Sequence, residues 1–372
     1  FEPLGLNVAE ANDFINQRLD EVHACIRDLV RLFSYGHFKQ SDYLPPSREI
    51  LAAIGEVHSA YNSTQILQAN ATFVDLSGWM DTGIYSFDEM LRRHFDEIDY
   101  DHELPIVTGY VKFNEGIMRR FDRGYSEITF SKIAVITNAR EGIIHKEYHL
   151  STGDPVLIGP DRVKVIGNIN FDIADQLADL DMEAIHSKAS KEMELCDIPI
   201  RIKNAFEPEH PGTLIARDFV SPIPKVDIIC GRDDLIALEI TDPEMVGLSG
   251  YDHRLLAQFY EKGISYIAKN VNANTITHFV HDKDNLLPDL ANSLSAEFTG
   301  AAVTLRKVAI VCAIGSNMKD SHIIARAILA LANEDIDILA LGQTMPRVNL
   351  QFIIDPDQFD AAQFVLHRTF FE

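Results

Sequence analysis

Apolar side chains recur every three to four residues along the first part of the chain, which predicts long amphipathic helices. Residues 7–33 keep this spacing, with acidic and basic residues between the apolar positions. The pattern breaks at 43–46, which contains Pro45 and Pro46, and resumes in 48–67, with Ser47 as the expected N-cap. We therefore expect two helices separated by a break, of which the first serves to pack the core.

Short apolar runs and helical segments alternate through the middle of the chain. A capping box formed by Ser86 and Glu89 opens one of the helices. Strands are expected at 71–76, 104–107, 142–146 and 199–203, and helices at 86–94, from about 126 to 134, 170–180 and 186–196.

The loop 122–127 joins the strand at 104–107 to a helix for which Ser126 is the expected N-cap. Gly124 permits close approach of the backbone, and Glu127 suits the first helical turn. Arg123 beside the free N–H groups of a helix start forms the outline of a carboxylate or phosphate site. A capped surface helix with an ordinary exposed arginine is the alternative.

Four prolines mark the clearest boundary in the chain, and a βαββα pattern follows it twice, with a period of roughly 65 to 70 residues. The second copy lacks a strand, which 226–230 could supply, so we expect the first copy to be inserted in the second. The prolines are Pro208, Pro211, Pro222 and Pro224. The expected strands are 235–240, 264–269, 275–280, 303–305, 307–312, 336–341 and 348–354, and the helices 251–261, 286–298, 320–333 and 359–370.

Composition limits the classes of function. The chain has 372 residues, 46% apolar and 24% charged, which suits a globular protein of two or three domains. A net charge of -23 argues against nucleic acid or an anionic membrane as the main partner, and no apolar run reaches the ~20 residues of a membrane span. The cysteines are far apart, without metal-binding spacing, so we expect reduced thiols in a cytoplasmic protein: Cys25, Cys196, Cys230 and Cys312.

Several short segments together resemble the aspartokinases of the amino-acid kinase family, above all the variant group found with ectoine biosynthesis. They are 55–59 (GEVHS), 122–129 (DRGYSEIT), 151–155 (STGDP), 202–206 (IKNAF) and 211–213 (PGT). The resemblance implies an α/β fold: a carbamate-kinase-like three-layer sandwich over 1–220, followed by a tandem ACT regulatory domain over 225–372. Its two ferredoxin-like βαββα ACT modules would be about 233–304, and 225–232 with 305–372.

The same resemblance implies a reaction and its residues. ATP, with Mg²⁺, would phosphorylate the β-carboxylate of L-aspartate; no protein ligand of the metal is assigned. Glu56 would hold the substrate amine, and Glu127, where the family has Asp, would lie near the transferred group. Lys146 has an equally weighted alternative as a solvated charge. The residues that would bind the substrate carboxylate are Arg123, Gly124, Tyr125 and Ser126. The residues that would bind ATP are His145, Lys146, Ser151, Thr152 and Asp154.

ACT modules pair edge to edge and bind amino acids at strand–helix turns, which implies a homo-oligomer, in the simplest case a dimer. Lysine-sensitive relatives carry an acidic residue where this chain has Ile267, so lysine inhibition is not expected. Modules that only hold the dimer together are the alternative. The candidate effector turns contain Met245 and Gly250 in the first copy and Ser316 and Asn317 in the second.

Amino-acid kinases open with a Lys-Phe-Gly-Gly-Thr-Ser loop that holds the ATP phosphates, and residues 1–100 contain nothing like it. Either the sequence is part of a longer enzyme, which its ragged start favours, or the polypeptide lacks a working phosphate site. Two functions therefore remain: an aspartate kinase, or a non-catalytic amino-acid-binding regulatory subunit on a degenerate kinase fold. A native chain heavier than 41.8 kDa would favour the enzyme.

Overall fold

The computed structural model describes residues 2–67, 70–121, 124–180, 182 and 185–372. It divides into two compact units, Phe1–Gly142 with Lys188–Ile198, and Ile143–Ser187 with Pro199–Glu372. The expected boundary at 220–225 falls inside the second unit, and these two units do not test it. The domain limits therefore stay a prediction.

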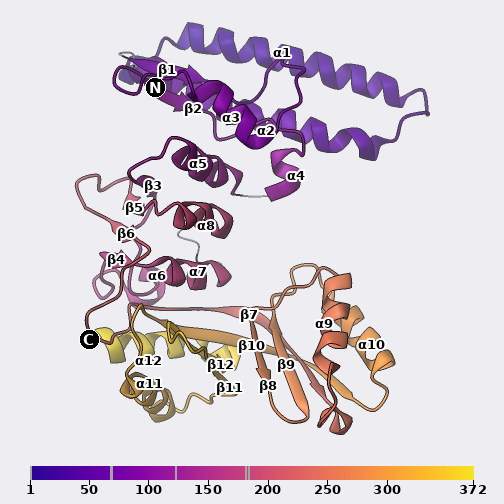
Figure 1. The fold of residues 1–372 in the computed structure, drawn as a ribbon, viewed down its shortest axis with the longest axis vertical. Coiled ribbons are helices and arrows are strands. Elements are labelled where there is room, and N and C mark those ends of the chain that lie inside the picture. Colours follow the sequence, from indigo (N-terminus) through magenta and orange to yellow (C-terminus); the bar gives the residue numbers. More distant parts are fainter. Residues whose placement is uncertain (1, 68–69, 122–123, 181, 183–184) are drawn as a thin grey trace. The chain divides into compact units, whose positions relative to one another are not determined.

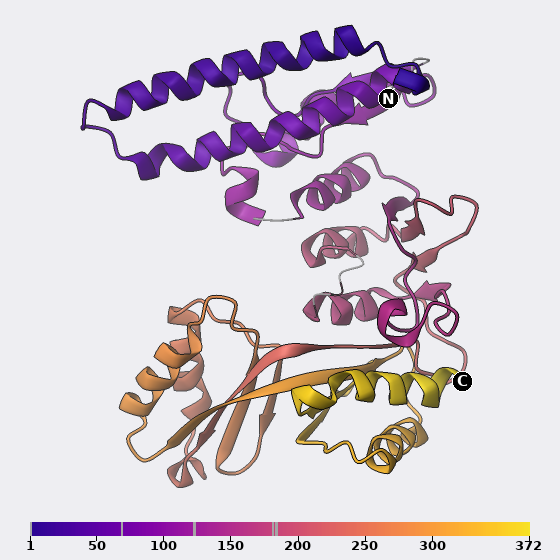
Figure 2. The ribbon, with the colours of Figure 1, turned by 180° about the vertical axis from the view of Figure 1, so that it is seen from behind.

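Two long helices dominate the first unit and lie side by side in Figures 1 and 2, α1 (Val8–Phe33) and α2 (Gln40–Leu67). Asn7 caps α1 by accepting a hydrogen bond from Glu10 N at 3.3 Å. The ring of Phe14 on α1 stacks on Tyr61 of α2 with 3.8 Å between centroids. Stacking and burial of the facing apolar stripes hold the pair together.

The predicted break at 43–46 and the N-cap at Ser47 are wrong, because α2 runs through Pro45 and Pro46. Ser47 Oγ instead donates to Tyr43 O at 2.8 Å, the bond of a residue inside a helix. The Tyr43 ring packs on Phe33 at 5.7 Å between centroids, which fixes this first stretch of α2 against α1. Tertiary packing here outweighs the helix-breaking tendency of proline.

The first unit also contains two parallel strands with shorter helices. Strands β1 (Ala71–Val74) and β2 (Leu104–Val107) pair from Ala71 opposite Leu104 to Val74 opposite Val107. The capping box of Ser86 and Glu89 is confirmed in both directions. The helices are α3 (Phe87–Phe95), α4 (Ile117–Phe121), α5 (Tyr125–Ile136) and α8 (Ser187–Leu195).

The second unit begins with a four-stranded sheet in the order β3-β5-β6-β4. Asn170 caps α7 as expected, accepting from Ile173 N at 3.1 Å. The elements are β3 (Gly142–Lys146), β4 (Asn168–Ile169), β5 (Ile200–Asn204), β6 (Thr213–Ile215), α6 (Pro155–Ile158) and α7 (Phe171–Asp179).

A six-stranded antiparallel sheet in the order β11-β12-β10-β7-β9-β8 forms the rest of the second unit. Its two long central strands, β7 and β10, each run through both βαββα copies. The strands expected at 226–230 and 235–240 are therefore one continuous strand, and so are those expected at 303–305 and 307–312. The strands are β7 (Ile228–Thr241), β8 (Ala268–Val271), β9 (Thr275–Val280), β10 (Ala302–Ile314), β11 (Ala340–Gln343) and β12 (Asn349–Ile354).

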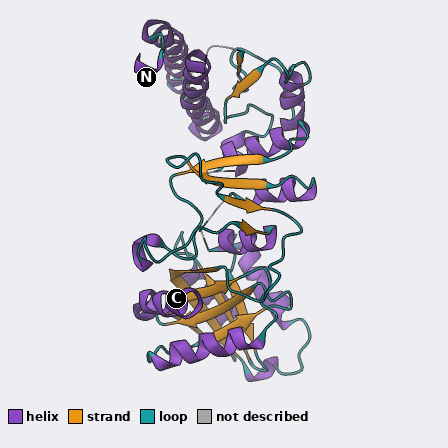
Figure 3. Cartoon of the chain, turned by 90° about the vertical axis from the view of Figure 1, so that its left-hand side faces the viewer, coloured by secondary structure: helices purple, strands orange, loops and turns teal. Residues whose placement is uncertain are grey.

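Two separate helix pairs cover this sheet, one for each copy of the repeat (Figures 1 and 3). One buried cluster joins Leu255 and Leu290 of the first pair to the β7–β9 half of the sheet. The other joins Ala327 and Leu366 of the second pair to the β10–β12 half. Each copy thus buries its own core on the shared strands. The pairs are α9 (Tyr251–Glu261) with α10 (Leu287–Glu297), and α11 (Ser321–Asn333) with α12 (Phe359–Phe371).

All four cysteines are free thiols, Cys25 and Cys196 exposed and the other two buried. The fold places Cys230 of β7 directly opposite Cys312 of β10, which their distance in the sequence did not reveal. Burial raises the pKa of Cys312 to about 12, so this thiol is protonated at neutral pH. Among the described helices, none combines the length and apolar character needed to cross a bilayer.

Candidate functional site

The first candidate site forms where α2 meets the start of α5. Ser126 Oγ donates to Glu56 Oε1 at 2.8 Å, although 70 residues separate the two in the sequence. Glu56 is half-buried on α2, while Ser126 is exposed. The two predicted substrate residues are therefore brought together, with a carboxylate fixed in place beside the helix start.

Gly109, just after β2, lies against both of these side chains. A Cβ atom on Gly109 would lie 2.7 Å from Glu56 Oε2 and 2.8 Å from Ser126 Oγ, so only glycine leaves room for both side chains. Thr129 Oγ1 donates to Gly109 O at 2.6 Å and fastens this backbone to α5. Thr129 lies one helical turn after Tyr125, and its local sequence predicted no role for it.

The N-cap of α5 is Gly124, with φ 74° in the left-handed region, and not Ser126 as expected. Ser126 lies within the first turn, and its hydroxyl bonds to Glu56 instead of capping the helix. Glu127 is in the first turn, as expected. The first backbone hydrogen bond of the helix runs from Glu127 N to Gly124 O at 3.1 Å. The N–H groups of Tyr125 and Ser126 therefore lie before the first hydrogen bond of the helix. Arg123 and Asp122 lie outside the described residues.

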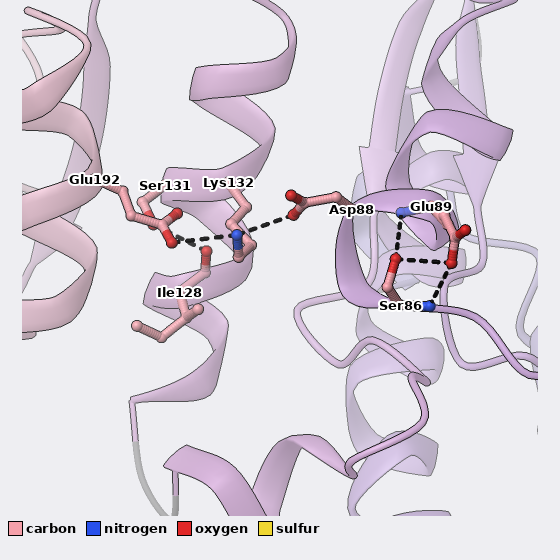
Figure 4. Close-up of polar contacts among 7 residues, drawn as sticks. All are labelled: Ser86, Asp88, Glu89, Ile128, Ser131, Lys132 and Glu192. Carbon is pink, nitrogen blue, oxygen red and sulfur yellow. Dashed lines mark hydrogen bonds and ion pairs between the residues drawn. The ribbon is translucent and has the colours of Figure 1, made fainter.

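A lysine on the next turns of α5 fixes this helix against two neighbours (Figure 4). Lys132 Nζ lies 2.9 Å from Asp88 Oδ1 on α3 and 3.2 Å from Glu192 Oε1 on α8. Burial acts to lower the pKa of Lys132, but the two carboxylates outweigh it and the net pKa is raised. The cation therefore stays charged at neutral pH and secures the helix that carries Tyr125 and Ser126.

A second carboxylate, Glu49, lies two turns before Glu56 on α2 and was missed in the sequence. Its Oε2 accepts from Tyr110 OH at 2.9 Å, and its Oε1 accepts from Met118 N at 2.9 Å at the start of α4. Burial, followed by the Glu49 carboxylate, raises the pKa of Tyr110. Burial and the carboxylates of Glu56 and Glu49 likewise raise the pKa of Tyr125. The seven-residue spacing of the glutamates, which puts them on one helix face, was the available signal.

The predicted nucleotide segment lies in the second unit, on and after β3. His145 is exposed, and Lys146 O accepts from Ala205 N at 2.9 Å, which brings the 202–206 motif beside the strand. Asp154 caps α6 by accepting from Val156 N at 2.8 Å. Ser151 Oγ donates to Gly153 O at 2.8 Å, so the segment is an ordered turn.

Thr152 differs from the other predicted nucleotide residues because its side chain points into the protein. Its Oγ1 lies 2.9 Å from His367 Nε2 on α12 and accepts from Lys164 N at 3.1 Å. The hydroxyl is thus used internally, and any contribution of Thr152 to a nucleotide site comes from holding the turn in place.

The two candidate effector turns differ in how they are occupied. In the first copy, Met245 is buried and Gly250 caps α9 with φ 80°, while Val246 between them is 63% exposed. In the second copy, Ser316 Oγ accepts from Ser221 N at 2.9 Å, and Asn317 Nδ2 donates to Ser221 O at 2.9 Å. The polar groups of the second turn are therefore bonded to Ser221 of the same chain, whereas the first turn exposes Val246 to solvent.

No group of three or more His, Cys, Asp or Glu side chains in the described ranges is arranged to hold a metal ion. A site in which Mg²⁺ is carried by phosphates would not require such a group, because the protein then commonly supplies only one or two carboxylates.

Comparison with known proteins was made at three levels. The model of the amino acid kinase family matches residues 8–204. The aspartate kinase Ask_Ect of Stutzerimonas stutzeri is 44% identical over 365 residues, 97% of this chain and 77% of that protein. Aspartokinase 1, chloroplastic, of Arabidopsis thaliana is 25% identical over 350 residues, 88% of this chain and 61% of that protein. This chain thus spans about three quarters of the length of the first relative and about three fifths of the length of the second.

Among solved structures, E. coli aspartokinase III in complex with aspartate and ADP resembles this chain with a TM-score of 0.74. The alignment covers 98% of this chain and 82% of that chain at 19% identity. The similarity extends over both units and establishes the fold expected from the sequence.

Proposed function

This chain belongs to the amino acid kinase family, and we propose that it is an aspartate kinase, which transfers the γ-phosphoryl group of ATP to the β-carboxylate of L-aspartate. The observation that carries the proposal is the 2.8 Å contact between Ser126 and Glu56, which joins two family motifs into one site. The 44% identity to an aspartate kinase and the fold shared with an aspartate- and ADP-bound aspartokinase support it.

The residues of this site suit an amino-acid substrate. Glu56 supplies a fixed anion for the α-ammonium group, and the amides at the start of α5 provide donors for a carboxylate. Arg123, next to these amides in the sequence, would add a bidentate cation. One bond forms between a β-carboxylate oxygen and the γ-phosphorus, while the bond to the β–γ bridging oxygen breaks and ADP leaves.

Phosphoryl transfer depends on positioning and charge neutralisation more than on covalent help from the protein. We assign nucleotide binding to the turn 151–154 together with His145 and Lys146, which the backbone places beside the 202–206 motif. Mg²⁺ would neutralise the phosphates, and Glu127, in the first turn of α5, is our acidic candidate near the transferred group. The product would feed the synthesis of ectoine or of aspartate-family amino acids.

We also propose that the protein works in the cytoplasm as a homo-oligomer assembled through its βαββα modules. Four free thiols support a reducing compartment. Strands β8 and β11 are the edges of the six-stranded sheet, and such edges are suited to pairing with a second copy. Size-exclusion chromatography with light scattering would test this, and a monomer at micromolar concentration would contradict it.

The function is tested by incubating the full-length protein with Mg-ATP and L-aspartate and trapping the acyl phosphate with hydroxylamine. We expect aspartyl hydroxamate and ADP in equal amounts. An absence of both products, with amino-acid binding retained, would instead support a regulatory subunit on a kinase scaffold.

Saturating L-lysine is expected to leave the rate of hydroxamate formation largely unchanged. The lysine ammonium needs an acidic partner, and half-buried Ile267 is apolar. Initial rates with aspartate near its KM, with and without lysine, check this. Strong inhibition would show that another carboxylate serves the effector amine.

A further inference from the structure

A fully buried histidine on the last helix contacts the turn to which nucleotide binding is assigned. His367 on α12 has no exposed surface, and Thr152 is 6% exposed. His367 Nε2 lies 2.9 Å from Thr152 Oγ1, across 215 residues of sequence. A polar pair removed from water in this way is costly to separate, because the group left behind would have no partner.

Thr152 is held at three further points. Its N donates to Lys164 O at 3.0 Å, and its Oγ1 accepts from Lys164 N at 3.1 Å. Its O accepts from Ile229 N of β7 at 2.9 Å. The residue is therefore fixed to a neighbouring backbone segment, to the six-stranded sheet and, through His367, to α12.

The histidine ring also packs against the following residue of the turn. A Cβ atom on Gly153 would lie 3.1 Å from His367 Cδ2 and 3.3 Å from Ile158 Cγ1. The backbone of Gly153 thus lies directly against the ring, and Ser151 Oγ is bonded to its carbonyl oxygen. Any shift of the ring would displace the turn.

Helix α12 makes two more contacts with the same region. Lys164 Nζ donates to Phe371 O at 3.1 Å, and the Arg162 guanidinium lies 5.2 Å from the centre of the Phe364 ring. Burial lowers the pKa of His367, with Glu372 acting to raise it and Lys164 and Arg162 to lower it. The ring is therefore neutral at pH 7.

We propose that His367 is a positioning residue for the nucleotide, through which α12 of the second βαββα copy holds the turn 151–154 in its ATP-binding geometry. The inference rests on the proposed function, because it assumes that this turn binds ATP. It goes beyond that function by giving a specific role in ATP affinity to a residue that lies outside the kinase motifs.

The test uses steady-state kinetics of the full-length protein, with ATP varied at saturating aspartate and the reverse. Thr152→Val keeps the shape of the side chain but removes the hydroxyl, and His367→Leu removes its partner. His367→Leu is expected to raise the KM for ATP about tenfold, the effect of one lost buried hydrogen bond, while the KM for aspartate changes less than about twofold. Thr152→Val is expected to raise the KM for ATP at least as much, because it also removes the bond from Lys164 N. The double variant is expected to be little worse than Thr152→Val alone, because Thr152→Val already removes the bond to His367.

Two controls separate positioning from general destabilisation. Thr152→Ser keeps the hydroxyl and is expected to restore the wild-type KM for ATP. His278→Leu is a matched control, because His278 of β9 is equally buried but neither ring nitrogen has a hydrogen-bond partner in the described structure. It is expected to leave both KM values unchanged.

An unchanged KM for ATP in Thr152→Val would overturn the proposal, as would additive effects in the double variant or an equal loss in His278→Leu. Should His367→Leu fail to fold, His367→Phe, which keeps an aromatic ring but has no hydrogen-bonding nitrogen, takes its place with the same expected result. An inactive wild-type protein that binds no ATP analogue would overturn the proposed function and this inference together. An active wild type with unaffected variants would overturn only the inference.

Discussion

Replacing Glu56 by glutamine is expected to raise the KM for aspartate about 50-fold while the KM for ATP changes less than about twofold. Glutamine keeps the length of the side chain and an oxygen that can accept from Ser126 Oγ, now 2.8 Å from Glu56 Oε1. What is lost is the negative charge opposite the substrate ammonium. A charge-assisted hydrogen bond contributes about 1.5–3 kcal/mol, and its loss can account for a rise in KM of about 50-fold.

The matched control is Asp42→Asn, which removes the same charge from the first turn of the same helix. At 1.5 Å per residue it lies about 21 Å from Glu56 along α2, so both KM values are expected to stay near wild type. Kinetics of the two variants with each substrate varied in turn make the measurement. If Glu56→Gln raised both KM values equally, Glu56 would have a structural role and not a substrate-binding one.

Local sequence signals predicted most of the secondary structure. The helix at 251–261 and the strand at 275–280 have the bounds expected from their apolar spacing. The errors arose where tertiary contacts override a local signal. Helix α2 continues through two prolines because its first stretch packs on α1, and β7 and β10 join strands that looked separate. The charged residues between those runs, such as Arg306, sit on exposed stretches of a continuous strand and do not interrupt it.

The candidate site could be predicted only where a family motif marked it. Glu56 and Ser126 were found in this way, but their mutual contact depends on the packing of α2 against α5. Glu49 lies outside the family motifs, and Thr129 ends the 122–129 motif without an assigned role; both take their roles from neighbours that are distant in sequence. His367 is a stronger case, since an apolar helix at the end of the chain gave no reason to connect it with a turn near residue 152.

Replacing Arg123 by alanine is expected to lower kcat/KM for aspartate about 1,000-fold and to leave the fold intact. Arg123 itself lies outside the described residues, so the expectation rests on its neighbours. It immediately precedes Gly124, whose left-handed conformation starts α5. The backbone N–H groups that follow lie at the end of the helix where we predict that the substrate carboxylate binds. A guanidinium there would neutralise the substrate carboxylate with two parallel hydrogen bonds, which alanine cannot replace.

Two further variants make the result specific. Arg123→Lys keeps the charge but loses the planar fork, so its kcat/KM should fall between those of the wild type and Arg123→Ala. Arg120→Ala removes a cation three residues earlier, which pairs with exposed Glu115 and lies over the Phe121 ring. Because exposed ion pairs contribute about 0–1 kcal/mol, its kcat/KM should stay within about fivefold of wild type. Circular dichroism melting curves would show whether each variant is folded. Wild-type turnover in folded Arg123→Ala would remove Arg123 from the site and leave the amides of α5 as the carboxylate donors.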